Sequence, residues 1–71
     1  MSGPSYVICL SDGGHPESLI VRRLYARLPD AEAEIHGLLR VVDETGEDHL
    51  FPRDLFAPVD LPADVLDRLA S

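Results

Sequence analysis

The strongest constraint on the fold is a hairpin signal centred on Gly46, within residues 38–59 (LLRVVDETGEDHLFPRDLFAPV). Leu38–Val42 is a short aliphatic run with one arginine, which is typical of a strand. Residues 43–46 suit a type I turn that places Gly46 in the left-handed region, where glycine has no steric cost. We therefore predict that residues 50–52 form the return strand and that Gly46 fixes the register.

The residues after this hairpin predict a sharp change of direction. Pro52 ends the return strand, because proline lacks the backbone N–H that strand pairing uses. Arg53–Leu55 is too short and too polar for a long element, so we expect a single turn of 3₁₀ helix. The chain then returns to the core as a short final strand near Val59, and we predict that Phe51 and Phe56 both point inward.

This order of events carries a family resemblance. HLFPRDLFAPV resembles the end of an SH3 domain, where a strand closes in proline, makes a one-turn helix and returns. The resemblance equates Phe51 and Phe56 with core aliphatic residues. It equates Pro52 with the groove proline and Leu55 with the groove tyrosine. SLIVRRLYARLPD followed by LLRVVDETGEDHLFP also resembles a group of short, uncharacterised bacterial proteins with an SH3-like plan, and that resemblance brings no known activity.

The first half of the chain supplies the other expected strands. Residues 6–10 form a continuous apolar run bounded by Ser-Asp-Gly-Gly, which predicts a strand buried on both faces. The resemblance assigns residues 19–28 to a strand, although apolar residues four apart there also fit a helical stripe. The predicted fold class is all-β, a small SH3-like five-stranded antiparallel barrel with a short C-terminal helix. The alternative is an α+β fold with a helix at residues 17–28.

Two short helical segments are expected beside the strands. Residues 31–36 (AEAEIH) favour a helical turn that ends at Gly37. Pro62 suits the first position of a short helix over residues 62–70, whose apolar stripe should dock on the barrel or on a partner, because so short a helix is unstable alone. We expect residues 1–71 to form a single SH3-like domain in which residues 1–5 are a loose N-terminus.

Charge and cysteine content predict an acidic protein of the cytoplasm, and the resemblance implies a bacterial one. The net charge is −7 and all six basic residues are arginine. A surface of this sign repels phosphate backbones and anionic lipids, so neither a membrane nor a nucleic acid is an expected partner. The single cysteine, Cys9, allows no internal disulfide, which suits a reducing cytoplasm. No apolar run is long enough for a membrane span.

Catalytic and metal-ligating patterns are absent from the sequence. His15, His36 and His49 do not have the spacing that puts two ligands on one helix face. The acidic turn at residues 43–48 lacks the calcium-loop pattern, and Cys9 lies in an apolar run where a thiol is usually a small hydrophobic residue. We therefore expect no enzyme activity, no metal and no cofactor.

A protein-interaction module is the function that remains. The carried-over groove keeps only Pro52, with Asp12 as an acidic contact, and what remains around it is an apolar patch of Leu50, Pro52 and Leu55. This protein-binding patch, rimmed by Asp48, Arg53 and Asp54, would bind a protein partner or a second copy of the chain. The chain has no tryptophan, so polyproline binding is not expected. The C-terminal apolar stripe could instead fold back over the patch.

A nucleic-acid-associated barrel is the alternative function. It would use an arginine cluster early in the chain, which holds three of the six basic residues within six positions: Arg22, Arg23 and Arg27. Acidic residues flank this cluster closely in the sequence, which argues against nucleic-acid binding.

Overall fold

The computed structural model describes residues 5–70 of the chain. Its elements, in order, are β1 (Ser5–Cys9), β2 (Leu24–Leu28), α1 (Ala31–Ile35), β3 (Leu38–Val42), β4 (Asp48–Pro52), the 3₁₀ turn η1 (Arg53–Leu55), β5 (Phe56–Val59) and α2 (Ala63–Ala70). Residues 1–4 of the expected loose N-terminus lie outside the described residues. Ser5, which closes that expected segment, is the first residue of β1.

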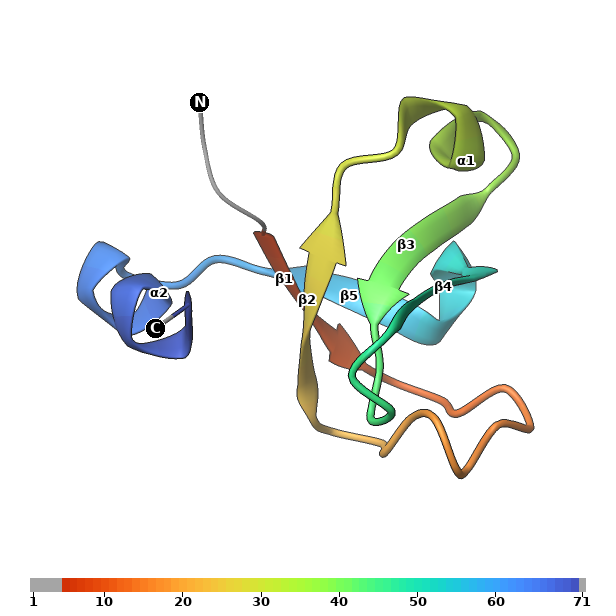
Figure 1. Cartoon of the computed structure of the whole chain (residues 1–71), viewed down its shortest axis with the longest axis horizontal. Helices are drawn as coiled ribbons and strands as arrows, with labels where there is room; N and C mark the ends of the chain where they lie inside the picture. Colours follow the sequence, from red (N-terminus) through yellow and green to blue (C-terminus); the bar gives the residue numbers. More distant parts are fainter. Residues whose placement is uncertain (1–4, 71) are drawn as a thin grey trace.

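The five strands form one strongly twisted antiparallel sheet in the order β4-β3-β2-β1-β5 (Figure 1). Strands β1 to β4 pair with their neighbours in the chain, and β5 returns to the other side of β1, where Cys9 is opposite Phe56. The predicted antiparallel five-stranded architecture is confirmed. The sheet is open, with β4 and β5 at its edges, so closure into a barrel is not confirmed.

The β3–β4 hairpin forms as the sequence predicts. The Gly46 N–H donates to the Asp43 carbonyl oxygen at 3.0 Å, and Gly46 has φ +85°, the left-handed conformation expected for the turn. Leu39 lies opposite Phe51 in the resulting register. The 3₁₀ turn and the short final strand also form where they were expected.

The segment before β2 corrects the prediction for residues 19–28. The strand begins only at Leu24, and residues 10–23 form a long loop that contains no helix. The predicted long strand is therefore wrong in its first half, and the predicted helix at residues 17–28 is wrong throughout. The physical reason is a tight turn. The Arg23 N–H donates to the Ile20 carbonyl oxygen at 3.2 Å, and Arg22 has φ +74°, which no strand accommodates.

The core lies on one face of the sheet and includes a residue from this loop. Alternate positions of β1 and β3 point inward, as the two-residue period of a strand requires. Both predicted core phenylalanines are buried, and their rings lie 6.1 Å apart in an edge-to-face arrangement. Strand β1 is buried on one face only, which corrects the prediction that both of its faces are buried. The buried cluster is Val7, Cys9, Leu19, Tyr25, Leu39, Val41, Phe51 and Phe56.

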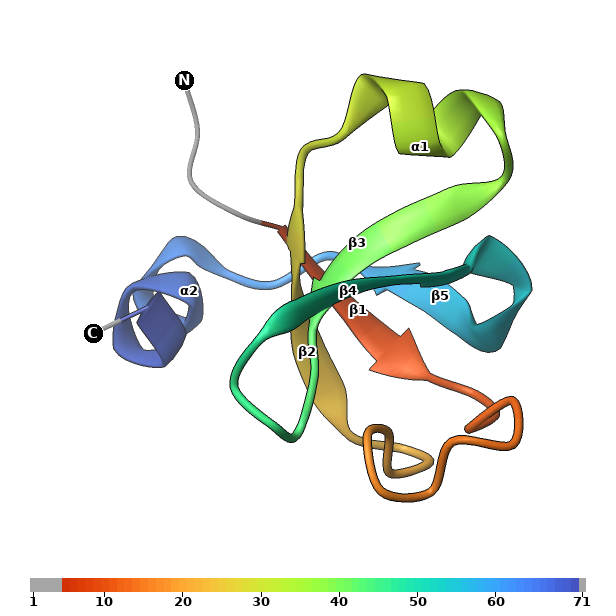
Figure 2. The ribbon, with the colours of Figure 1, turned by 45° about the vertical axis from the view of Figure 1, so that its right-hand side comes forward.

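The two helices differ in how they join the sheet. Helix α1 is capped by Asp30, whose carboxylate accepts the Ala33 N–H at 3.0 Å, and it packs beside β3. Helix α2 lies at the opposite end of the molecule from η1 in both views (Figure 2). Val65 and Leu66 are half-buried and Leu69 is 44% exposed. The stripe of α2 therefore does not fold back over Leu55 in η1.

Candidate functional site

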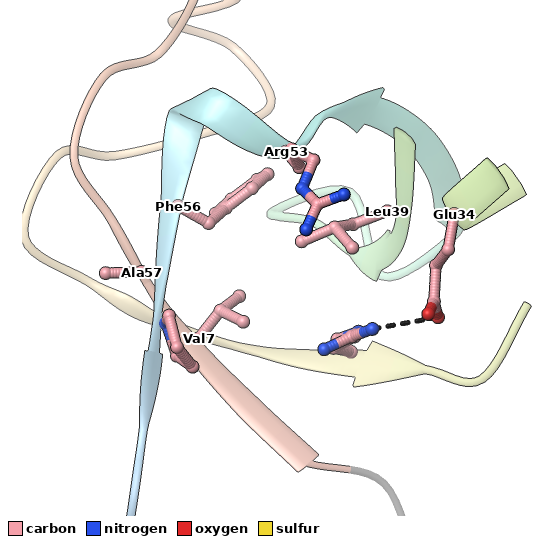
Figure 3. Close-up of a pocket in the computed structure, with 8 residues that line it drawn as sticks. Val7, Glu34, Leu39, Arg53, Phe56 and Ala57 are labelled. Carbon is pink, nitrogen blue, oxygen red and sulfur yellow. Dashed lines mark ion pairs between the residues drawn. The ribbon is translucent and has the colours of Figure 1, made fainter. Parts of the chain in front are cut away.

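A pocket of about 160 Å³ opens beside α1 and η1 (Figure 3). We call it the two-arginine pocket. It takes residues from four strands, from α1 and from η1: Val7, Arg27, Glu34, Leu39, Arg53, Phe56, Ala57 and Pro58.

The floor of the two-arginine pocket is the outer margin of the hydrophobic core. Val7, Leu39 and Phe56 are each at most 8% exposed, so their side chains are already held in place by the packing around them. A binding surface that is preformed in this way loses little conformational entropy when a ligand arrives.

Arg27 and Glu34 form an ion pair at the rim of the pocket. Arg27 lies two residues after Tyr25 in β2 and shares the inward face of that strand. Its Nη2 lies 2.8 Å from Glu34 Oε2, and this is the pair marked in Figure 3. The pKa of Glu34 is lowered, first by the hydrogen bond to Arg27 and further by the charge of Arg53. Glu34 is thus ionised at neutral pH.

Arg53 is the second positive charge of the pocket. Its backbone N–H donates to the Gly37 carbonyl oxygen at 3.0 Å, which ties η1 to the turn that follows α1. Gly37 has φ +74°, which favours glycine in this turn. Figure 3 shows the Arg53 guanidinium extending over the same space that Phe56 and Leu39 border. No side chain among residues 5–70 forms an ion pair with Arg53.

The predicted protein-binding patch is divided between two environments. Leu50 is 42% exposed and shares the outer face of β4 with Pro52, which is also exposed. Leu55 is half-buried and packs against the core cluster instead. Its Cδ1 lies 2.7 Å from the position that a Cβ on Gly13 would take, so the loop passes directly over it. The structure therefore gives Leu55 a packing role.

Asp12 belongs to the same loop and acts on its own backbone. One carboxylate oxygen accepts the Gly14 N–H at 2.9 Å. The adjacent backbone is held to η1, because the Leu10 N–H donates to the Leu55 carbonyl oxygen at 2.7 Å. The structure thus brings the Asp12 loop next to Leu55, whereas the exposed pair on β4 points to the outer face of the sheet.

The predicted arginine cluster is dispersed. Arg23 pairs with Glu44 at 3.3 Å on the hairpin, and Arg27 pairs with Glu34 in the pocket. Arg22 is exposed in the turn before β2. Two of the three positive charges are therefore balanced by neighbouring carboxylates.

Asp43 and His49 form a pair that no sequence pattern indicated. Asp43 is 5% exposed, and its carboxylate lies 2.8 Å from His49 Nδ1 while it also accepts hydrogen bonds from Thr45. The other ring nitrogen, Nε2, faces Glu47 at 3.9 Å. The pair stabilises the hairpin turn, and both ring nitrogens face carboxylates.

Cys9 is fully buried, and burial raises the pKa of its thiol. The predicted role of Cys9 as a small hydrophobic residue agrees with this environment. No group of three or more metal-ligating side chains occurs within residues 5–70. In that same part of the chain, no helix is long and apolar enough to cross a membrane.

The charged residues of the pocket were missed as a site because they are far apart in sequence. They come from β2, α1 and η1, and only the folded chain brings them together. One local signal was available. Arg27 follows buried Tyr25 at a spacing of two, so a strand there necessarily puts a guanidinium on the inward face. An inward-facing arginine indicates either an ion pair or a ligand.

Comparisons with protein-family models, with curated proteins and with solved structures find no match to this chain.

Proposed function

We propose that this chain is a small, non-enzymatic protein-interaction module that binds a peptide segment of a partner protein in the two-arginine pocket. The observation that carries the proposal is the combination of a rigid apolar floor with a guanidinium, Arg53, that has no ion-pair partner among residues 5–70. Small binding sites typically combine an apolar lining with a few placed polar groups.

The topology supports assigning the open sheet to the SH3-like plan. The strand order is β4-β3-β2-β1-β5, and a 3₁₀ turn lies between the fourth and fifth strands. The turn and the strand that follows it match the order of elements that the sequence resemblance implies. Small domains of this kind commonly serve as binding modules, although fold alone does not define function.

A binding role is also supported by how the reactive side chains are used. The Cys9 thiol is buried, and the Asp43–His49 pair closes a turn. A buried free thiol is consistent with a reducing cytoplasm, where we place the protein.

The proposal is tested by selecting a display library of random peptides on the full chain. A variant with the pocket blocked, Pro58→Phe, serves for counter-selection, because Pro58 is exposed and lines the pocket. Pro62→Phe is the matched control, since it makes the same substitution at an exposed proline outside the pocket. Far-ultraviolet circular dichroism confirms that both variants stay folded.

We expect the intact chain and Pro62→Phe to enrich the same peptides and Pro58→Phe to lose them. Amide shift changes on adding an enriched peptide should centre on Val7, Leu39 and Phe56. Equal enrichment by all three proteins, or shift changes centred on the outer face of β4, would show that the pocket is not the binding site.

A further inference from the structure

The two-arginine pocket has a charge pattern that selects its ligand. The chain carries a net charge of −7, yet this pocket holds two guanidinium groups and one carboxylate. Its local charge is therefore +1 inside an acidic molecule. Because Arg27 and Glu34 already neutralise one another, the unbalanced charge belongs to Arg53. A single negative charge on the ligand would restore neutrality.

The chemistry of the donors favours a carboxylate. A guanidinium presents five N–H donors in a planar fork that matches the two oxygens of a carboxylate. Arg27 directs Nη2 at Glu34, while no hydrogen bond within residues 5–70 uses the side chain of Arg53. A phosphate monoester carries about 1.5 to 2 negative charges at neutral pH, and Glu34 would repel it more strongly than a monoanion.

The size of the pocket limits the rest of the ligand. Pockets for drug-sized ligands are roughly 300–1,000 Å³, whereas a cavity of about 150 Å³ lined by apolar side chains accommodates a benzene ring. At about 160 Å³, the pocket fits one apolar side chain on the floor of Val7, Leu39 and Phe56.

The last residue of a peptide supplies both groups at once. In an extended chain, neighbouring side chains point to opposite faces, so an internal Asp or Glu and the apolar residue next to it do not enter the same small pocket. A C-terminal residue carries its carboxylate and its side chain on the same Cα. We propose that the two-arginine pocket binds the free C-terminal carboxylate of a partner peptide whose last side chain is apolar. This inference rests on the proposed function.

The test uses N-acetylated tetrapeptides, Gly-Ser-Gly-Leu, made as the free acid and as the C-terminal amide. Binding to the full chain is followed by amide chemical shifts and quantified by calorimetry. We expect the acid to bind about 10-fold to 150-fold more tightly than the amide, since hydrogen bonds to charged groups contribute about 1.5–3 kcal/mol. A Gly-Ser-Gly-Ser acid should bind more weakly than the leucine acid.

Two variants separate a local contact from long-range electrostatics. Arg53→Gln should abolish the preference for the acid and leave the affinity for the amide unchanged. Arg22→Gln removes one positive charge from another exposed arginine outside the pocket and should keep the preference. Equal loss in both variants would assign the effect to net charge and overturn the proposal.

The remaining outcomes distinguish this proposal from the proposed function. Equal binding of the acid and the amide in the pocket would overturn carboxylate recognition but leave the proposed peptide-binding function intact. The same conclusion would follow if neither tetrapeptide bound while library-selected peptides did bind in the pocket. Failure of the tetrapeptides together with an empty library selection would overturn both. Inorganic phosphate completes the set. Binding of phosphate as tight as that of the tetrapeptide acid would overturn the assignment to a peptide end.

Discussion

Tyr25 places its ring in the core and its hydroxyl group where the long loop meets the β3–β4 hairpin. The hydroxyl oxygen accepts the Ile20 N–H at 2.8 Å, and the hydroxyl donates to Glu44 Oε2 at 2.7 Å. The Glu44 N–H in turn donates to the Ser18 carbonyl oxygen at 2.9 Å. One buried hydroxyl thus holds residues 10–23 against the hairpin, which explains why this loop has a defined path without regular structure.

Replacing this hydroxyl should weaken the fold measurably. Tyr25→Phe keeps the ring in the core and leaves the Ile20 N–H without its acceptor, so we expect a loss of about 1–3 kcal/mol in the free energy of unfolding. Urea denaturation followed by circular dichroism measures it. Tyr6→Phe, at a half-buried tyrosine on the outer face of β1, is the matched control. An unchanged midpoint for Tyr25→Phe would show that the hydroxyl carries no stability.

The same residue predicts a loss of stability in alkali. Burial, followed by the hydrogen bond to Glu44, raises the pKa of Tyr25 to about 12. In the unfolded chain, Tyr25 loses this proton near a pH of about 10. The contribution of protonated Tyr25 to the free energy of unfolding is therefore complete below a pH of about 10 and is lost as the pH rises toward 12. The stability difference between the natural chain and Tyr25→Phe should therefore shrink over that interval. A constant difference would show that the pKa of Tyr25 is not raised in the folded chain.

Asp43 predicts the opposite behaviour, in acid. Burial raises the pKa of its carboxyl, but hydrogen bonds from Thr45 and His49 outweigh that effect and keep the pKa below its usual value. The charged form of Asp43 therefore contributes to the free energy of unfolding above the usual pKa of about 4. This contribution is lost as the pH falls through the lower pKa of the folded chain. Asp43→Asn should cost about 1–3 kcal/mol at neutral pH and progressively less below a pH of about 4.

Urea denaturation across an acidic pH series measures this difference. Asp60→Asn changes the net charge by the same amount at an exposed position, so it corrects for general charge repulsion. A cost of Asp43→Asn that stays the same down to the acid limit would mean that the charge of Asp43 contributes nothing to the turn.

At the level of elements, local sequence chemistry predicted what depends on neighbouring residues. Gly46 in the left-handed conformation, and the 3₁₀ turn after Pro52, are dictated by glycine and proline, so both were predictable. Residues 20–23 were not predictable in this way, because Val21 suits a strand while the spacing of Ile20 and Leu24 suits a helix. In the fold, Leu19 packs in the core and the Tyr25 hydroxyl oxygen accepts the Ile20 N–H, and these contacts override both local preferences.

The candidate site was likewise predictable only where it depends on neighbouring residues. Leu50 and Pro52 were predicted to be exposed, and both are exposed in the structure. Neighbouring side chains in a strand point to opposite faces, so the buried Phe51 between them requires it. Leu55 was predicted to be exposed as well, yet it packs over the core, since glycine at position 13 leaves room for it. The pocket itself depends on strand pairing and on the position of α1, which no local pattern encodes.

Helix α2 should contribute little to the stability of the sheet. It stands apart from the five strands in both views, and Leu69 in its apolar stripe is 44% exposed. We expect a chain ending at Asp60, and the full chain with Leu66→Pro, each to lose helical signal while the free energy of unfolding changes by about 1 kcal/mol or less. Circular dichroism and urea denaturation measure both quantities. A loss of several kcal/mol would show that the stripe packs on the sheet.

At the scale of the whole molecule, shape and charge are set by different parts of the chain. The Cα radius of gyration is 11.6 Å, against about 11 Å for a compact chain of this length, and the longest axis is 33 Å. Helix α2 at one end accounts for the elongation in Figure 1. Acidic side chains dominate the surface, and two of the arginines proposed for nucleic-acid binding are engaged with Glu44 and Glu34.

This charge distribution makes a definite prediction about nucleic acids. A protein that neutralises phosphates loses affinity steeply between roughly 50 and 200 mM salt, whereas a net charge of −7 repels the backbone, most strongly at low salt where screening is weakest. We expect fluorescence anisotropy to detect no binding of labelled single-stranded or duplex DNA, or of RNA, even at the lowest salt. Glu44→Gln, which releases Arg23 from its ion pair, is the informative variant, because it frees a positive charge next to Arg22. Binding by the natural chain that weakens steeply with salt and disappears in Arg22→Gln would restore the arginine cluster as a nucleic-acid surface.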